Sequence, residues 1–410
     1  MAAVLLTAAV GCSLLAGCGT DTDTSASAEE SGSDIPAEAY EDVVSYLTDG
    51  AVSGDDVVYT VNGIDITAYE YFYYLTYEEY VYTNQYYSTY YEYPDLTEEM
   101  SDGTTLADYI EQDAYSSAVT DAVVYAAAQE AGVTLSDEYQ EDLDSYISDN
   151  IESLGEELWE TAVDEEEISE DDYTDEEKAA WIAEAGSEQL ALNMMSYSTT
   201  EDAVETFYEK NYYAQQYKED LFSEGGEEEP DEYDLMVYIS DNGVYACRYI
   251  LIYDTSETAL ESAEEICSEL SALSGDEFDE AFAAYAENNI DGNTTGEYVF
   301  DDYDTLVDGF AELVAELSVG EVGVTEETDY GYFVIVRDEV TADSVYTSTS
   351  GYTVLDQYTD DAFDELSAEW AADAEVTDTG ALDSFDYYEF LDALEEFREL
   401  LEEYTGVSEE

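Results

Sequence analysis

The sequence predicts an α+β protein: a mostly helical domain carrying an inserted domain with a small antiparallel sheet packed by helices. Three observations support this. Residues 117–147 and 176–222 repeat their apolar side chains with helical spacing, whereas 244–254 and 330–339 are short β-type runs. An acidic stretch with Gly and Pro, residues 223–234, separates the two regions and is typical of a linker. We therefore expect a helical domain at 55–222 and a second domain at 235–340.

Composition indicates a folded protein with an unusual charge balance. Of its 410 residues, 45% are hydrophobic and 14% aromatic, enough for two or three cores. Asp and Glu number 107 against 6 Lys and Arg, giving a formal charge of −101. This excludes nucleic acid and anionic lipid as partners bound through basic side chains. Two interpretations remain open: an acidic solvated surface suited to a saline or acidic exterior, or attraction of cationic proteins and divalent ions.

The amino terminus predicts the compartment. Residues 2–16 are apolar but too short to span a bilayer, and Leu15-Ala16-Gly17-Cys18 follows. This resembles the lipobox of bacterial lipoproteins, which implies a signal peptide at 1–18, an acylated Cys18 and an extracytoplasmic, membrane-anchored protein. We expect an acidic flexible tether at 19–54. Because no Lys or Arg precedes the apolar run, the true start could lie upstream of Met1.

The helical domain opens with a β-run that breaks at Asn62-Gly63. Thr67 and Glu70 have the spacing of a capping box and predict the start of a helix. A later helix is expected to end at Gly132, and the next to begin near Ser136. This order resembles the chaperone domain of SurA and PrsA foldases.

Tyrosine is concentrated at residues 69–94, in YEYFYYLTYEEYVYTNQYYSTYYEYP. One helix face cannot bury so many rings, so several should stay partly exposed. Tyr offers a large rigid surface with a polar tip, which suits the binding of unfolded segments. The alternative is that these rings pack the core of the domain or follow the bias that gives 42 Tyr overall.

The second domain is expected to contain two strands around Asn242-Gly243, helices at about 256–273 and from about 276, a third helix carrying Leu306 and Phe310, and a final strand at 330–339. This order resembles the parvulin (PpiC-type) rotamase domain over about 244–339. The matching positions are Arg248–Ile252, Phe278, Gly296, Phe300, Phe310, Leu317–Glu321 and Thr328–Ile335.

The resemblance implies a peptidyl-prolyl cis-trans isomerase whose substrate is proline-containing peptide in unfolded exported proteins. It assigns substrate contacts to Leu306, Phe310, Tyr298 and Thr328, and a polar position to Asp291. The two histidines typical of the family are replaced by Tyr249 and Phe333, and the chain contains no histidine.

Loss of both histidines weakens the prediction of catalysis. Rotation about the prolyl bond breaks no covalent bond, so an apolar site that favours the twisted amide lowers the barrier without a general base. A Tyr hydroxyl can replace a cross-strand hydrogen bond, but Phe333 cannot. We expect weak isomerisation or none, and the alternative is a non-catalytic peptide-binding chaperone.

Other chemistry has little support. Cys247 and Cys267 are expected to be buried free thiols, with a disulfide as the alternative. Two thiols without imidazole cannot form a zinc site, and residues 287–298 lack the bidentate Glu of a calcium loop, so no metal or cofactor is expected.

The carboxyl-terminal segment, residues 341–410, is expected to form helices near 360–373 and 386–403 with an extended stretch between them. It resembles the return segment of PrsA-like foldases, which packs back on the chaperone domain. An independent tail is the alternative.

Overall fold

The computed structural model describes residues 35–97, 103–164, 168–169, 173–253, 255–287, 294–301, 306–348 and 351–405. Cys12, Cys18 and Asp291, with the predicted signal peptide, lie outside these residues. The chain divides into two compact units, Met1–Asp220 with Asp364–Glu410, and Leu221–Phe363. Helices and small antiparallel sheets make up both units, so the predicted α+β class is confirmed.

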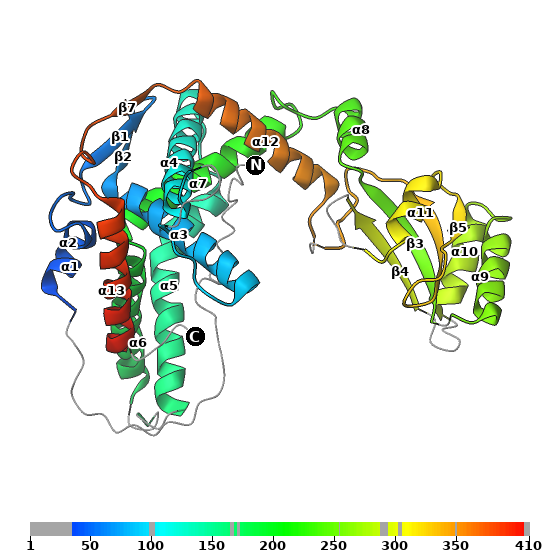
Figure 1. The fold of residues 1–410 in the computed structure, drawn as a ribbon, viewed down its shortest axis with the longest axis horizontal. Coiled ribbons are helices and arrows are strands. Elements are labelled where there is room, and N and C mark those ends of the chain that lie inside the picture. The colour runs from blue at the N-terminus through cyan, green and yellow to red at the C-terminus, as the bar shows by residue number, and fades with distance from the viewer. Residues whose placement is uncertain are drawn as a thin grey trace. The chain divides into compact units, whose positions relative to one another are not determined.

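The first unit is mainly helical (Figure 1). Its helices are α1 (Ala37–Glu41), α2 (Val43–Leu47), α3 (Ala68–Tyr90), α4 (Leu106–Ala131), α5 (Asp137–Asp164), α6 (Asp175–Ser196), α7 (Glu201–Phe222), α12 (Val354–Ala372) and α13 (Tyr387–Thr405). Its strands are β1 (Val57–Val61), β2 (Ile64–Thr67) and β7 (Val376–Asp378). The unit boundaries fall inside α7 and α12.

The three-stranded sheet pairs strands that are far apart in the sequence. Its order is β2-β1-β7, and Tyr59 pairs with Asp378 while Val61 pairs with Val376. Asn62 extends the pairing, because its backbone N–H donates to the Glu375 carbonyl and its side-chain oxygen accepts from the Glu375 N–H. The carboxyl-terminal segment thus supplies a strand to the sheet formed by β1 and β2.

The predicted helix boundaries around this sheet are confirmed. Thr67 accepts a hydrogen bond from the Glu70 N–H and Glu70 accepts from the Thr67 N–H, which closes the capping box of α3. Gly132 ends α4 in the left-handed conformation at φ 74°. Local side-chain chemistry alone sets both boundaries, because a capped N–H and a left-handed glycine need no distant partner.

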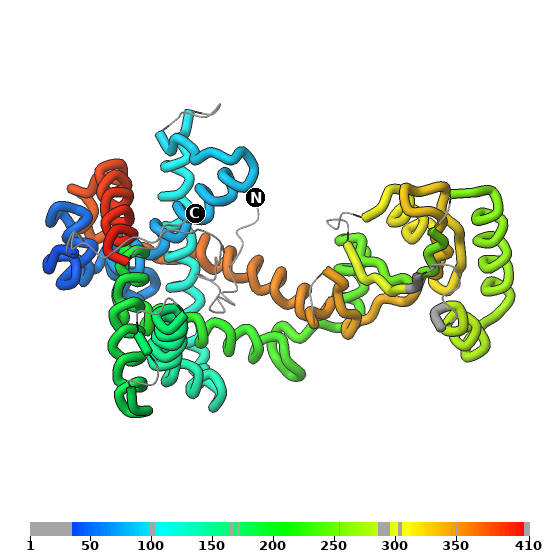
Figure 2. Tube along the Cα trace, turned by 90° about the horizontal axis from the view of Figure 1, so that it is seen from below, coloured from blue at the N-terminus to red at the C-terminus, as the bar shows by residue number. Residues whose placement is uncertain are grey.

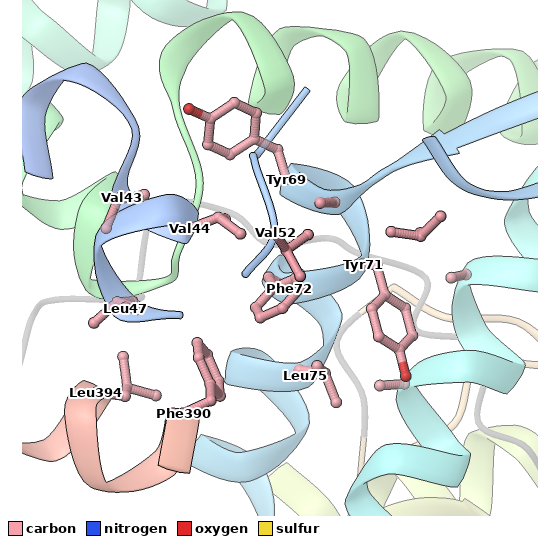
Figure 3. Close-up of a cluster of buried hydrophobic side chains, with 14 of the residues drawn as sticks. Val43, Val44, Leu47, Val52, Tyr69, Tyr71, Phe72, Leu75, Phe390 and Leu394 are labelled. Carbon is pink, nitrogen blue, oxygen red and sulfur yellow. The ribbon is translucent and has the colours of Figure 1, made fainter. Parts of the chain in front are cut away.

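The core of this unit gathers segments that are distant in sequence. Figure 3 shows Val44 and Leu47 of α2, Phe72 of α3, and Phe390 and Leu394 of α13 around one apolar interior. Phe72 and Phe390 contact edge to face at 4.9 Å between ring centroids. In Figure 1, α13 lies alongside α6.

The expectation of a flexible tether over 19–54 is wrong for residues 35–54. Ile35, Ala39 and Val43 recur at four-residue spacing, and they are buried in the core. Asp42 caps α2, since its carboxylate accepts a hydrogen bond from the Ser45 N–H at 2.9 Å. The acidic composition concealed this apolar stripe, which α13 and α3 cover.

Two glycines bring α5 and α6 together. A Cβ added to Gly155 would lie 2.0 Å from the Ile182 carbonyl oxygen, and one added to Gly186 would lie 1.9 Å from the Ile151 carbonyl oxygen. Only hydrogen at these positions allows the two backbones to approach so closely.

The second unit has a four-stranded antiparallel sheet in the order β4-β3-β6-β5. Its strands are β3 (Tyr245–Ile252), β4 (Thr294–Phe300), β5 (Val322–Val324) and β6 (Tyr332–Asp338), and its helices are α8 (Glu232–Asp241), α9 (Glu257–Leu270), α10 (Asp276–Glu287) and α11 (Phe310–Glu316). Ile250 and Val334 pack against α9 and α10, whereas Cys247 and Ile335 pack against α11 on the opposite face.

The expected hairpin around Asn242-Gly243 is wrong, because residues 232–241 form α8. Asp231 caps this helix by accepting from the Tyr233 and Asp234 N–H groups. Gly243, at φ 58°, follows the last turn. The Asn-Gly pair therefore ends a helix instead of joining two strands, since a left-handed glycine serves either purpose.

The two cysteines of the described residues are free. Cys247 is buried on the α11 face of the sheet, and Cys267 on α9 lies at the other face, where its thiol contacts the Val322 carbonyl oxygen at 3.5 Å. Because the sheet separates them, they cannot form the disulfide that the sequence left open.

Candidate functional site

Four aromatic rings meet on the α11 face of the second sheet. Tyr249 of β3 lies 5.8 Å from Tyr298 of β4 in a stacked arrangement, and it contacts Phe310 of α11 and Phe333 of β6 at 5.7 and 5.6 Å. Phe310 and Phe333 touch edge to face at 5.1 Å. We call these four residues the aromatic cluster.

Strand register brings the cluster together. Tyr249 pairs with Gly296 on one side and with Ile335 on the other, so its neighbours on the same face come from both flanking strands. A Cβ added to Gly296 would lie 2.6 Å from the Tyr249 hydroxyl oxygen and 2.7 Å from ring carbon Cζ. The Tyr249 ring thus lies flat over a strand position that only glycine leaves open.

The four rings are unequally exposed. Phe310 and Phe333 are 3% and 5% exposed, whereas Tyr249, Tyr298 and the neighbouring Leu306 are half-buried. Tyr249, Tyr298 and Leu306 therefore form the more accessible layer of this face, and both Phe rings contact Tyr249 beneath it. The sequence placed Phe310 in contact with substrate, and the structure places it beneath the accessible layer.

Burial favours the neutral forms of Tyr249 and Cys247. It raises the pKa of the Tyr249 hydroxyl, and the nearby Tyr298 adds to the rise. Burial, with a further contribution from Asp338, raises the pKa of the Cys247 thiol to about 12. At neutral pH Tyr249 is a hydrogen-bond donor and Cys247 a protonated thiol, so neither is a ready nucleophile.

Arg337 positions α11, and the sequence interpretation missed it. Its Nη1 donates to the Leu317 carbonyl at 2.8 Å and to the Ala315 carbonyl at 3.3 Å, and its guanidinium lies 4.8 Å from the Tyr245 ring centroid. These bonds satisfy carbonyls at the carboxyl end of the helix that carries Phe310. The signal was available, because Arg337 follows Phe333 and Ile335 at alternate strand positions.

Thr328 lies in a turn that precedes β6. Its hydroxyl donates to the Gly331 carbonyl at 2.7 Å and accepts from the Tyr330 N–H. The hydroxyl that contacts the cluster's strand belongs instead to Thr325, which accepts from the Phe333 N–H at 3.0 Å. The structure thus brings Tyr249, Tyr298, Phe310, Phe333 and Leu306 together but engages Thr328 within its own turn.

Arg248, the first residue of the parvulin-like strand, serves the opposite face. Its guanidinium donates two hydrogen bonds of 2.8 Å to Asp338 and one of 2.9 Å to Asp279. It also lies over the Phe278 and Phe282 rings at 5.4 and 5.2 Å. These contacts tie α10 to the sheet behind the aromatic cluster.

Comparisons with known proteins agree with this geometry. Residues 240–341 match the family model described as the PPIC-type PPIase domain, which confirms the parvulin resemblance for this part of the chain. Similar solved structures include PrsA from Bacillus subtilis, at 16% identity over 74% of this chain and 92% of that one with a TM-score of 0.19. The foldase protein PrsA from Streptococcus pneumoniae is 16% identical over 60% of this chain and 90% of that one, with a TM-score of 0.20. These TM-scores are too low to show a shared overall fold, and no curated protein matches.

Proposed function

Because residues 240–341 form a PPIC-type domain, we propose that this protein is an extracytoplasmic foldase that binds proline-containing segments of exported proteins and isomerises their prolyl bonds slowly. The observation that carries the proposal is the aromatic cluster, with the half-buried Tyr249 and Tyr298 above Phe310 and Phe333. The structural similarity of the whole chain to the two PrsA structures is too low to support this proposal.

The chemistry required is modest. The barrier to rotation about a peptide bond is about 18–20 kcal/mol, and it arises from loss of amide resonance in the twisted form. An apolar surface that holds the proline ring, while withdrawing the amide from water, favours the twisted form because that form is less polar than the planar one. Tyr249, Tyr298 and Leu306 supply such a surface, and the Tyr hydroxyls supply donors.

Slow turnover follows from the substitutions. Phe333 has no polar atom where the family carries histidine, and it is 5% exposed beneath Tyr249. The neutral Tyr249 hydroxyl is therefore the polar group left at the two histidine positions. A single donor stabilises a twisted amide less than a fixed network of donors does.

The second candidate is a non-catalytic peptide-binding chaperone. The burial of Phe310 and Phe333 favours this candidate, because these two rings lie beneath the accessible layer. The four rings therefore cannot enclose the proline of a bound peptide. Such a surface binds a proline ring by stacking and gives little preference to the twisted form over the planar forms.

A protease-free isomerisation assay on a chromogenic Xaa-Pro peptide separates the two. We expect the full chain to accelerate cis-to-trans conversion above the solvent rate, Tyr298→Ala to lower the acceleration, and Tyr249→His to increase it. Tyr253→Ala is the matched control, because Tyr253 is exposed and follows the same strand. A rate equal to that in solvent, with the peptide still bound by calorimetry, supports the chaperone. A peptide that does not bind refutes both.

Membrane attachment through Cys18 is a separate part of the proposal, and the lipobox-like Leu15-Ala16-Gly17-Cys18 supports it. In the described residues, the helices are all too short or too polar to cross a bilayer. Bacterial expression of the full chain should place the protein in the membrane fraction and the Cys18→Ser variant in the soluble fraction. Equal distribution of the two would refute acylation at Cys18.

A further inference from the structure

The carboxyl-terminal end of α3 presents a tyrosine-rich surface that the parvulin-like site does not explain. Tyr87, Tyr90, Tyr91 and Tyr93 are 42%, 60%, 82% and 67% exposed, and Tyr86 lies among them. We call these five residues the tyrosine surface. In both views the end of α3 and the segment after it project from the rest of their unit (Figures 1 and 2).

The rings of this surface contact one another, and Tyr91 lies edge to face with Tyr87 at 6.4 Å between centroids. Tyr87 and Tyr93 stack at 4.9 Å between centroids, and Tyr86 and Tyr90 lie 4.5 Å apart. At these separations the rings touch, so nothing inserts between them and their outer faces are what a partner meets. The other end of α3 differs, because Tyr69 and Tyr71 are buried in the core. The two sequence interpretations of the tyrosine run therefore apply to different halves of one helix.

Charge decides which partner fits these rings. The exposed Glu92 and Asp95 adjoin the surface, and the chain as a whole carries a formal charge of −101. An aromatic face is the negative end of the ring quadrupole and attracts cations, and neighbouring carboxylates add to that attraction. A partner with acidic side chains would be repelled.

The protein already pairs cations with rings internally. The Arg337 guanidinium lies over Tyr245, and the Lys178 ammonium lies over Trp159 at 5.0 Å. Lys210, Arg248 and Arg398 are held in ion pairs. The sixth basic residue, Lys218, also has an interaction within the chain. All six basic side chains thus have internal partners, so a cation for the tyrosine surface must come from another molecule.

We propose that the tyrosine surface binds extended, arginine-bearing segments of client polypeptides, with guanidinium groups stacked on the outer faces of Tyr87, Tyr90 and Tyr93. Arg fits better than Lys because its planar group stacks on a ring and is less strongly hydrated. The interaction is independent of proline and of the aromatic cluster. It gives a foldase a second contact with its client, selected by charge.

Fluorescence anisotropy with the full chain and a labelled peptide of alternating Arg and Ser tests the proposal. The Tyr87→Leu/Tyr90→Leu/Tyr93→Leu variant keeps net charge and apolar side chains but loses the rings, and its affinity should fall about tenfold. The corresponding Phe variant keeps the rings and should bind like wild type. A peptide with citrulline in place of Arg has the same shape without charge and should bind weakly.

Tyr233, Tyr253 and Tyr330 provide the matched control. They are 65%, 53% and 55% exposed and belong to the other unit, so replacing them with Leu removes three comparable rings elsewhere and should leave affinity unchanged. Undiminished binding by the first Leu variant, equal loss in both Leu variants, or equal affinity for the citrulline peptide would each overturn the proposal. Thermal unfolding verifies that the variants fold, and Tyr90→Leu alone should still lower affinity about threefold.

Discussion

The Tyr74 hydroxyl of α3 donates a hydrogen bond to the Asp121 carboxylate of α4. Lys210 of α7 makes an ion pair with Glu70 of α3 beside it. The same Tyr-to-carboxylate pairing recurs in both units, at Tyr82–Asp113, Tyr139–Glu219, Tyr404–Glu188, Tyr238–Asp361 and Tyr285–Glu269. In a chain with 107 acids and 6 bases, phenol hydroxyls act as donors where other proteins use Lys and Arg.

The Asp121 pair predicts a pH dependence of stability. Burial raises the pKa of Asp121 to about 6, against smaller lowering effects from Tyr74 and Lys210, while Glu70 raises it further. Between the unfolded value near 4 and this folded value, the folded state binds more protons, so the free energy of unfolding falls as pH rises. We expect Asp121→Asn to reduce the fall measured by urea unfolding between pH 4.5 and 7.5.

Repulsion among all the carboxylates also lowers the free energy of unfolding as pH rises. The difference between the variant and wild type therefore gives the contribution of Asp121. Asp95→Asn serves as the control, because Asp95 is exposed and its pKa is lowered by hydrogen bonds from Thr97. An Asp121→Asn variant with the same pH profile as wild type would show that Asp121 contributes nothing.

Salt should stabilise the protein. The excess of negative charge leaves few attractive pairs to be screened and many repulsive ones, and the Debye length shrinks from about 10 Å at 0.1 M to about 3 Å at 1 M salt. We expect the melting temperature to rise by several degrees between low and high KCl in calorimetry. Tyr-to-carboxylate bonds tolerate salt better than ion pairs because only one partner is charged. A melting temperature that falls with KCl would contradict this.

Gly296→Ala should displace the Tyr249 ring. The added Cβ would lie 2.6 Å from the hydroxyl oxygen, and the ring cannot swing freely because Tyr298 and Phe310 contact it. We expect a loss of about 1–3 kcal/mol in the free energy of unfolding. In a Tyr249→Ala background the same substitution should cost at least about 1 kcal/mol less, since the clashing ring is absent. Equal costs in both backgrounds would mean that the ring does not lie over Gly296.

Arg337→Met should loosen α11. It removes two charge-assisted bonds to the helix carbonyls and the contact with Tyr245, and we expect a loss of about 1–3 kcal/mol in unfolding free energy, with weaker binding of Xaa-Pro peptide. Arg248→Met is the control, because it removes a comparable network on the opposite face. Peptide affinity should fall for Arg337→Met alone, and equal loss in both variants would argue against a positioning role for Arg337.

Sequence reasoning succeeded where the signal is local. The capping box of Thr67 and Glu70 and the end of a helix at Gly132 each depend on neighbouring residues, and each is found as predicted. It failed at Asn242-Gly243, because an Asn-Gly pair can either end a helix or form a hairpin turn. It also failed at residues 35–54, because the apolar residues there are interspersed among many acidic ones.

By itself the sequence determined the class of the protein, the parvulin-like order of its second domain and the absence of histidine from the site. Only the tertiary structure decided which of the matching residues a ligand can reach, because exposure depends on how Tyr249 and Tyr298 lie over Phe310 and Phe333. It also decided which tyrosines of α3 are core and which are surface. Composition gives the number of aromatic rings, whereas the burial of each ring depends on segments, distant in sequence, that pack over it.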